Sequence, residues 1–110
     1  MFNTKQLISW YQLTLTRIDI NAGKDLDIQD EFQSLYEHLD RPEDISLFRL
    51  RDPSSEPMLY YVSTDDENNF HTKLIQYFVK KFQGVPCEEP GRDLVSPLIT
   101  NNPGDLFRAA

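Results

Sequence analysis

The sequence predicts an α+β domain in which an antiparallel sheet carries two helices on one face. Two segments, residues 28–39 and 65–83, have the apolar periodicity of helices, and two strand-like segments, residues 45–51 and 58–63, lie between them. A strand near the N-terminus and a short strand after the second helix complete the order strand, helix, strand, strand, helix, strand. This order is the split βαβ pattern of a ferredoxin-like sandwich. Many unrelated functions share the pattern, so it predicts the fold and not the function.

The size and composition are those of one folded domain. The chain has 110 residues, and aromatic residues make up 12% of it, which supplies large side chains for a single core. One cysteine excludes an internal disulfide framework and a cysteine-rich metal site. The sequence has no run of 18 apolar residues and no secretory signal. We therefore expect a cytoplasmic protein without a membrane-spanning helix.

The charge of the chain is acidic and unevenly distributed. Asp and Glu number 18 against 11 Lys and Arg, a net charge of −7. Residues 19–67 contain 14 acidic and four basic residues, whereas residues 68–83 contain three lysines and no acid. Since affinity for nucleic acids and for anionic membranes comes largely from Lys and Arg, the acidic balance argues against both partners.

The second helix has sequence signals at both of its ends. Thr64, followed three residues later by Glu67, has the spacing of a capping box, in which each side chain satisfies a free backbone N–H. Lys80 and Lys81 suit the negative end of the helix dipole, and Gly84 suits a left-handed cap. The apolar stripe that we expect to face the sheet consists of Phe70, Leu74, Tyr77, Phe78 and Phe82, widened by Ile75 and Val79.

The first helix is predicted to begin after Asp27 and to end before Pro42. Asp27 suits the N-cap position, and the residue before a proline avoids helical angles. A calcium-binding loop needs Gly at its sixth position and Glu at its twelfth, and a loop that starts at Asp25 has neither. Helix capping therefore explains the acidic residues at positions 25–31 better. The apolar stripe of this helix consists of Ile28, Phe32, Leu35, Tyr36 and Leu39.

The N-terminal segment allows two interpretations. Residues 11–16 alternate between apolar and polar side chains, which favours a strand that we place at residues 10–20. The apolar residues of the same segment also have a helical spacing. If the segment is a helix, the alternative fold is a three-helix α+β domain around one β-hairpin.

Prolines and glycines interrupt the chain after the second helix. Residues 85–89 are expected to form a brief last strand, and residues 94–100 are a second candidate that Pro97 weakens. We assign residues 1–91 to a single α+β domain and residues 92–110 to a Pro-rich C-terminal extension that is partly loose.

The two hairpin strands carry apolar side chains on both faces, which predicts a sheet that is covered at least partly on both sides. Their basic and aromatic side chains resemble a platform for single-stranded RNA, but the aromatic–glycine pattern of such platforms is absent. The residues that we nominate as a possible protein-interaction surface are Phe48, Arg49, Arg51, Tyr60 and Tyr61.

Two helices can cover only one face of such a sheet. The other face would expose apolar side chains such as Phe48, Leu13 and Tyr60 or Tyr61, and large apolar patches usually mark interfaces. The simplest cover is a second copy related by a two-fold axis, which would make the protein a homodimer. The alternative cover is the C-terminal tail, folding back through Val95, Leu98 and Ile99.

No pattern of residues nominates a catalytic or metal-binding site. His38 and His71 are the only histidines, and a zinc site would need the two helices to bring them together. Cys87 lies beside Glu88 and Glu89, whose carboxylates disfavour a reactive thiolate. The glycines form no phosphate-binding loop. We therefore expect no cofactor and no metal, and we lean against an enzyme.

Three functions remain open at this point. The leading hypothesis is a non-catalytic protein-interaction or regulatory module that binds a protein partner or a second copy of itself. The second is a small ligand-binding protein or enzyme with a pocket between sheet and helices. The third is an acidic nucleic-acid mimic that inhibits another protein by occupying its nucleic-acid-binding site. A deep polar cleft containing His71 or Cys87 would favour the second hypothesis.

Overall fold

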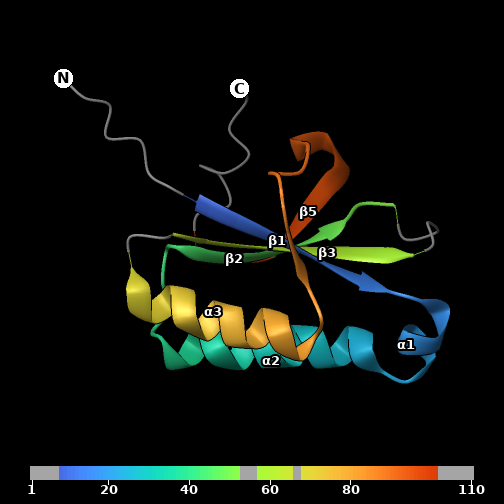
Figure 1. Ribbon diagram of the computed structural model, residues 1–110, viewed down its shortest axis with the longest axis horizontal. Helices are drawn as coiled ribbons and strands as arrows, with labels where there is room; N and C mark the ends of the chain where they lie inside the picture. Colours follow the sequence, from blue (N-terminus) through green and yellow to red (C-terminus); the bar gives the residue numbers. More distant parts are fainter. Residues whose placement is uncertain (1–7, 53–56, 66–67, 102–110) are drawn as a thin grey trace.

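A computed structural model of the chain describes residues 8–52, 57–65 and 68–101. Its strands form one antiparallel sheet in the order β4-β1-β3-β2-β5, and helices α2 and α3 pack against one face of it (Figure 1). The strands are β1 (Ile8–Leu15), β2 (Ile45–Leu50), β3 (Met58–Asp65), β4 (Val85–Cys87) and β5 (Val95–Ile99). The helices are α1 (Arg17–Asn21), α2 (Lys24–His38), α3 (Asn69–Lys81) and the short 3-10 helix η1 (Arg92–Leu94). The α+β class is confirmed.

The two long helices each connect strands that are not neighbours in the sheet. Helix α2 leads from β1 to β2, and β3 lies between these two strands. Helix α3 leads from β3 to β4, and β1 lies between them. The central pair, β1 and β3, is antiparallel from Ile8 opposite Asp65 to Leu15 opposite Met58. The N-terminal segment is therefore a strand in the middle of the sheet, and the three-helix alternative is wrong.

The first strand is shorter than predicted, because a helix cap ends it. Thr16 and Asp19 form a reciprocal capping box, in which each side chain accepts from the other residue's backbone N–H. These hydrogen bonds from Thr16 lower the pKa of the Asp19 carboxyl. Helix α1 consequently takes residues that we expected to continue the strand, and Ile18 is 79% exposed.

The main core lies between the sheet and the two long helices. Tyr60 and Leu13 are both fully buried there, so the expectation that Leu13 lies on the face without helices is wrong. The core also includes the helix residues Ile28, Phe32, Tyr36, Ile75, Phe78 and Val79 and the strand residues Leu15, Ile45, Leu47, Val62 and Ile99.

A second, smaller cluster lies on the opposite face of the sheet. Phe48, Tyr61 and Val95 form it, and Trp10 and Cys87 pack against it as partly buried neighbours. The rings of Trp10 and Phe48 have their centroids 5.5 Å apart. The sheet therefore buries apolar side chains on both faces, as the two-sided pattern of the hairpin strands predicts.

The start of α3 corrects the predicted capping box. Thr64 lies in β3, and the N-cap of α3 is Asn68, whose side-chain oxygen accepts from the backbone N–H of His71. Glu67 lies outside the described residues. The prediction that Thr64 caps the helix is wrong because β3 extends to Asp65, where its pairing with β1 ends.

The end of α3 also differs from its sequence signals. Gln83, and not Gly84, has the left-handed conformation, with φ of 59°. Gly84 instead lies close to other side chains, since a Cβ at this position would be 2.8 Å from Cγ1 of Val79. The glycine therefore permits a close approach between the end of the helix and the sheet. It does not form the left-handed helix cap that we predicted.

Helix α2 begins four residues before the predicted position. Its N-cap is Gly23, with φ of 85°, so Asp27 lies inside the first turn and does not cap the helix. The helix ends at His38, and Asp40 and Arg41 follow in left-handed conformations before Pro42. The end of the helix is therefore near the predicted boundary, whereas the start is not.

The two strands that follow α3 form the two edges of the sheet. Both candidate strands of the tail form, as β4 beside β1 and β5 beside β2. Pro97 lies opposite Phe48 on this edge strand, and a register shift occurs between Leu47 and Phe48. Ile99 enters the core on the helix side, while Val95 enters the smaller cluster.

Candidate functional site

The five residues nominated as an interaction surface are divided between the two sides of the sheet. Tyr60 is 0% exposed on the helix side, and its hydroxyl donates to Asp25 and accepts a 2.9 Å hydrogen bond from Gln29 of α2. Phe48 and Tyr61 are 1% and 9% exposed on the other side. Three of the five are therefore interior side chains.

The two arginines of that set do not share an exposed surface with the aromatic residues. Arg49 is half-buried and lies opposite Tyr60 in the register of the hairpin. Arg51 is exposed, and its guanidinium donates to the backbone oxygen of Val95 at 3.3 Å. Arg51 therefore binds the first residue of β5. The five nominated residues do not lie together on one exposed surface.

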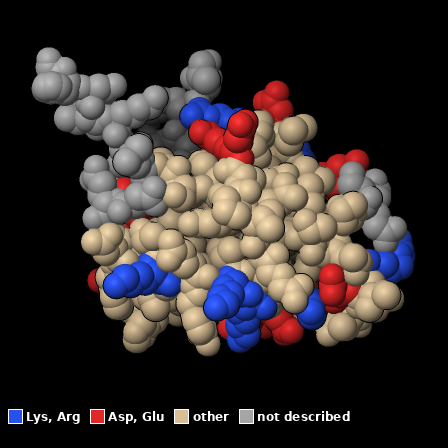
Figure 2. All heavy atoms as spheres, in the orientation of Figure 1, with Lys and Arg blue, Asp and Glu red and all other residues tan. Residues whose placement is uncertain are grey.

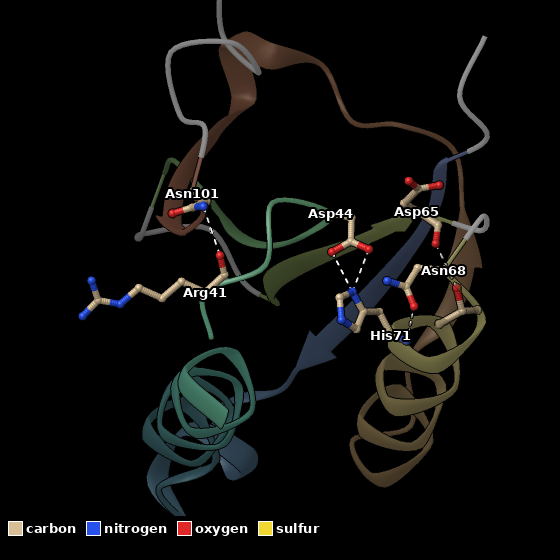
Figure 3. Close-up of polar contacts among 7 residues, drawn as sticks. Arg41, Asp44, Asp65, Asn68, His71 and Asn101 are labelled. Atoms are coloured by element: carbon tan, nitrogen blue, oxygen red, sulfur yellow. Dashed lines mark hydrogen bonds and ion pairs between the residues drawn. The ribbon is translucent and has the colours of Figure 1, made fainter. Parts of the chain in front are cut away.

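The best-formed polar cluster joins the start of α3 to the segment before β2. The Nδ1 atom of His71 lies 2.8 and 2.7 Å from the two carboxylate oxygens of Asp44, and both side chains are about five-sixths buried (17% and 16% exposed). Since a carboxylate only accepts hydrogen bonds, Nδ1 carries the proton and donates a hydrogen bond to Asp44. Figure 3 shows His71 pointing from α3 toward Asp44, with Asn68 beside it.

This His–Asp pair holds two parts of the fold together. Asp44 also accepts, through its backbone oxygen, from the backbone N–H of Asp65 at the end of β3. A carboxylate-oriented histidine can act as a base, but a base needs a nucleophile in reach. The hydrogen bonds of the described residues connect the ring to Asp44 alone, so the arrangement as it stands fixes the start of α3.

The other two candidate residues, His38 and Cys87, lie apart from that cluster. His38 is exposed at the end of α2. Cys87 is a free thiol in β4, where burial raises its pKa and the Glu88 carboxylate raises it further. In residues 8–52, 57–65 and 68–101 no three potential metal ligands come together. Within the same ranges no helix is long and apolar enough to cross a membrane.

One open groove lies at the far end of β2. It has a volume of about 400 Å³ and is lined by Leu50, Arg51, Asp52, Asp93 and Leu94. This groove lies at the edge where η1 meets β2, away from His71 and Cys87, and its charged side chains are of both signs.

The outward side of α3 presents the most distinctive exposed surface of the described residues. Phe70 and Tyr77 are 61% and 72% exposed, although the sequence pattern assigned both to the buried stripe. Two exposed lysines share this side, and we call the four residues at steps of three, seven and ten the basic–aromatic face: Phe70, Lys73, Tyr77 and Lys80. Figure 2 shows basic side chains over α3 beside a broad uncharged surface.

The charges of this face are available for a partner. Lys73 and Lys80 form no ion pair with another described residue. Lys81, in contrast, bonds to Glu31 of α2 at 2.6 Å, and this hydrogen bond raises the pKa of Lys81. Helix α3 therefore uses one lysine to hold α2 and leaves two beside exposed aromatic rings.

The outward side of α2 is acidic. Asp27, Asp30, Ser34 and Glu37 are exposed and follow the same steps of three, seven and ten, and we call them the acidic face. Helices α2 and α3 lie side by side and run in opposite directions (Figure 1), and the rings of Phe32 and Phe78 meet between them at 5.5 Å. The helix layer thus carries two adjacent surfaces of opposite charge.

Comparison with known proteins gave no relative: no family model matches the chain, and neither the curated proteins nor the solved structures contain a significant match. The candidate sites therefore rest on their residues and geometry.

Proposed function

We propose that this chain is a non-catalytic protein-interaction module that binds an acidic protein surface through the basic–aromatic face of α3. The observation that carries the proposal is the exposure of Phe70 and Tyr77 beside two lysines that form no ion pair within the described part of the chain, whose net charge as a whole is −7.

The composition of the basic–aromatic face suits protein recognition. Exposed aromatic side chains are enriched at the centres of interfaces, where they bury large areas at small cost in conformational entropy. Residues at steps of three, seven and ten on a helix form one straight stripe, which is how a helix presents anchors to a partner. Lys73 and Lys80 alternate with the rings along this stripe, so the face favours a partner that offers carboxylates.

Two other classes of ligand fit the surroundings less well. A nucleic acid would meet the acidic face of α2 next to the lysines, and the overall negative charge opposes its approach. A small ligand in the space between sheet and helices would compete with the side chains of the main core, such as Phe32, Tyr60 and Phe78, which fill that space.

We also propose that the fold is a ferredoxin-like split βαβ sandwich with β5 as an added edge strand. The strand order β4-β1-β3-β2, with each long helix bridging one intervening strand, supports this assignment. No other described element covers the outer side of the helix layer, which leaves α2 and α3 free to bind a partner.

Photo-crosslinking from a single position tests the proposed function. A photoreactive phenylalanine analogue is placed at Tyr77, and a matched control places it at Leu94, which is also exposed (58%) but lies in η1. In the native host we expect adducts from position 77 that map to an acidic protein segment and that disappear when Lys73→Glu and Lys80→Glu are added. Equal adducts from both positions, or none from position 77, would contradict the proposal.

A further inference from the structure

We infer that the acidic surface bound by the basic–aromatic face is the acidic face of α2 in a second copy of this chain. The two copies form a symmetric dimer in which the helix layers pack face to face. This inference rests on the proposed function, because it names the partner of the same surface.

The two faces have matching spacing and opposite character. The basic–aromatic face places lysines at positions 73 and 80, and the acidic face places carboxylates at positions 30 and 37. Both pairs are seven residues apart, which is two helical turns or about 10 Å along the axis. Two carboxylates on one helix can therefore meet two lysines on another in a single alignment.

A two-fold axis brings these residues to the same level. The proposed axis runs parallel to α2 and α3 and lies on the side of the helix layer that faces away from the sheet. A half-turn about this axis leaves the position of each residue along the helix direction unchanged. It places α2 of one copy against α3 of the other. Residues that are level within one molecule are then level across the interface.

The ring contact between the helices indicates which residues lie at about the same level along them. Phe32 and Phe78 lie side by side, with centroids 5.5 Å apart, and the helices run in opposite directions (Figure 1). Two residues back from Phe32 is Asp30, and two residues on from Phe78 is Lys80. Counting five residues the other way pairs Glu37 with Lys73. The alignment required by symmetry is thus the alignment that pairs each lysine with a carboxylate.

The same rotation closes the assembly. Each copy contributes one acidic face and one basic–aromatic face, and both are used once in the dimer, so no charged face remains to recruit a third copy. The helices have 15 and 13 residues, which gives a footprint of roughly 400 Å² per copy. The total of about 800 Å² is below the roughly 1,200–2,000 Å² of stable interfaces and suits a transient one. We therefore expect a weak dimer that is sensitive to salt.

Sedimentation equilibrium with charge-reversal variants tests the dimer. Variant A carries Lys73→Glu and Lys80→Glu, and variant B carries Asp30→Lys and Glu37→Lys. In about 50 mM salt, at concentrations up to a few hundred micromolar, the wild-type chain should dimerise, and each variant alone should bind itself at least about tenfold more weakly, because its paired helices carry like charges. An equimolar mixture of A and B should form a heterodimer, since both of its helix contacts again pair opposite charges.

A control variant separates this pairing from a general effect of charge. Arg41→Glu with Arg92→Glu changes the net charge as much as variant A does, at two exposed positions outside α2 and α3, and it should dimerise like the wild type. All these substitutions are at exposed sites, and circular dichroism checks that each variant is folded.

The possible outcomes separate the dimer from the broader proposal. A wild-type chain that stays monomeric throughout the concentration range overturns the dimer, as does a mixture of A and B that associates no better than either variant alone. If the chain is monomeric but position 77 still crosslinks to an acidic segment of another protein, the dimer fails and the proposed function stands. If position 77 crosslinks to nothing, both fail.

Discussion

Thr64 and Asn68 lie four residues apart at the junction between β3 and α3, and their polar side chains have opposite surroundings. Thr64 is 0% exposed, and its Oγ1 atom has no hydrogen-bond partner among residues 8–52, 57–65 and 68–101. Asn68 places its side-chain oxygen 3.2 Å from the backbone nitrogen of His71 and satisfies a free N–H of the helix start. A buried hydroxyl without a partner costs stability, whereas a helix cap contributes it.

Substitution at these two positions should therefore have opposite effects. Thr64→Val keeps the shape of the side chain and removes the unsatisfied hydroxyl, so the free energy of unfolding should stay the same or rise by about 1–2 kcal/mol. Asn68→Ala should lower it by about 0.5–2 kcal/mol through the lost cap. Urea denaturation followed by circular dichroism measures both. A loss of more than about 1 kcal/mol in Thr64→Val would mean that the hydroxyl has a partner in solution.

The thiol of Cys87 should react slowly near neutral pH. Burial and the neighbouring Glu88 raise its pKa, so at any pH below that pKa the reactive thiolate is a smaller fraction than in a free cysteine. We expect a disulfide reagent at pH 8 to modify Cys87 more slowly than glutathione and the rate to rise as the pH increases. Glu88→Gln should speed the reaction, because it removes the second cause of the shift. A rate equal to that of glutathione would argue against this environment.

At the scale of the element, α3 has two sides that sequence periodicity alone does not distinguish. The aromatic residues of α3 follow one stripe in the sequence pattern, but Phe78 is 4% exposed and Tyr77 is 72% exposed. Phe78 packs edge-on against Phe32 of α2 and lies 5.0 Å from the ring of Phe82. The inward side of α3 therefore contributes to stability, and the outward side is available for binding.

This division predicts different consequences for adjacent substitutions. Phe78→Ala should lower the free energy of unfolding by about 3–5 kcal/mol, because it removes buried area and leaves a cavity. The matched control Tyr77→Ala should change it by less than about 0.5 kcal/mol in dilute solution. Both are measured by urea denaturation at low micromolar concentration. Similar losses in the two variants would mean that the outward side of α3 is also packed in the isolated chain.

At the scale of the whole molecule, β5 connects the end of the described chain to the central hairpin. It pairs with β2, and its side chains enter both core clusters, through Ile99 on the helix side and Val95 on the other. The backbone N–H of Arg51 donates to the oxygen of Leu94 just before this strand, at 2.7 Å. Such two-sided packing predicts that β5 unfolds together with the rest of the sheet.

Trp10 provides a probe for this cooperativity, because its ring contacts Phe48 on the side of the sheet opposite Ile99. Ile99→Ala should lower the free energy of unfolding by about 2–5 kcal/mol, and Trp10 fluorescence and circular dichroism should shift together. Leu94→Ala, at a 58% exposed position, is the control and should have little effect. If Ile99→Ala leaves the Trp10 transition unchanged, β5 unfolds independently of the domain.

The sequence by itself determined the class of the fold, the hairpin and the approximate positions of both long helices. These features depend on residues that are close along the chain: the periodicity of residues 28–39, the strand formers on either side of the turn, and the proline at position 42. Of the candidate site, the sequence also revealed the contrast between an acidic middle segment and a basic second helix, since charge is a property of composition and needs no contact.

Only the tertiary structure decided how these elements are used. Thr64 has the local signature of a cap, but pairing with β1 keeps it in a strand. Phe70 and Tyr77 fit the apolar stripe of α3, but α2 and the sheet together cover a side centred on Ile75 and Phe78 and leave those two rings exposed. The pairing of His71 with Asp44, 27 residues away, follows from the same packing. Each of these outcomes depends on contacts between distant segments, whose free energies outweigh the smaller local preferences that a sequence pattern reports.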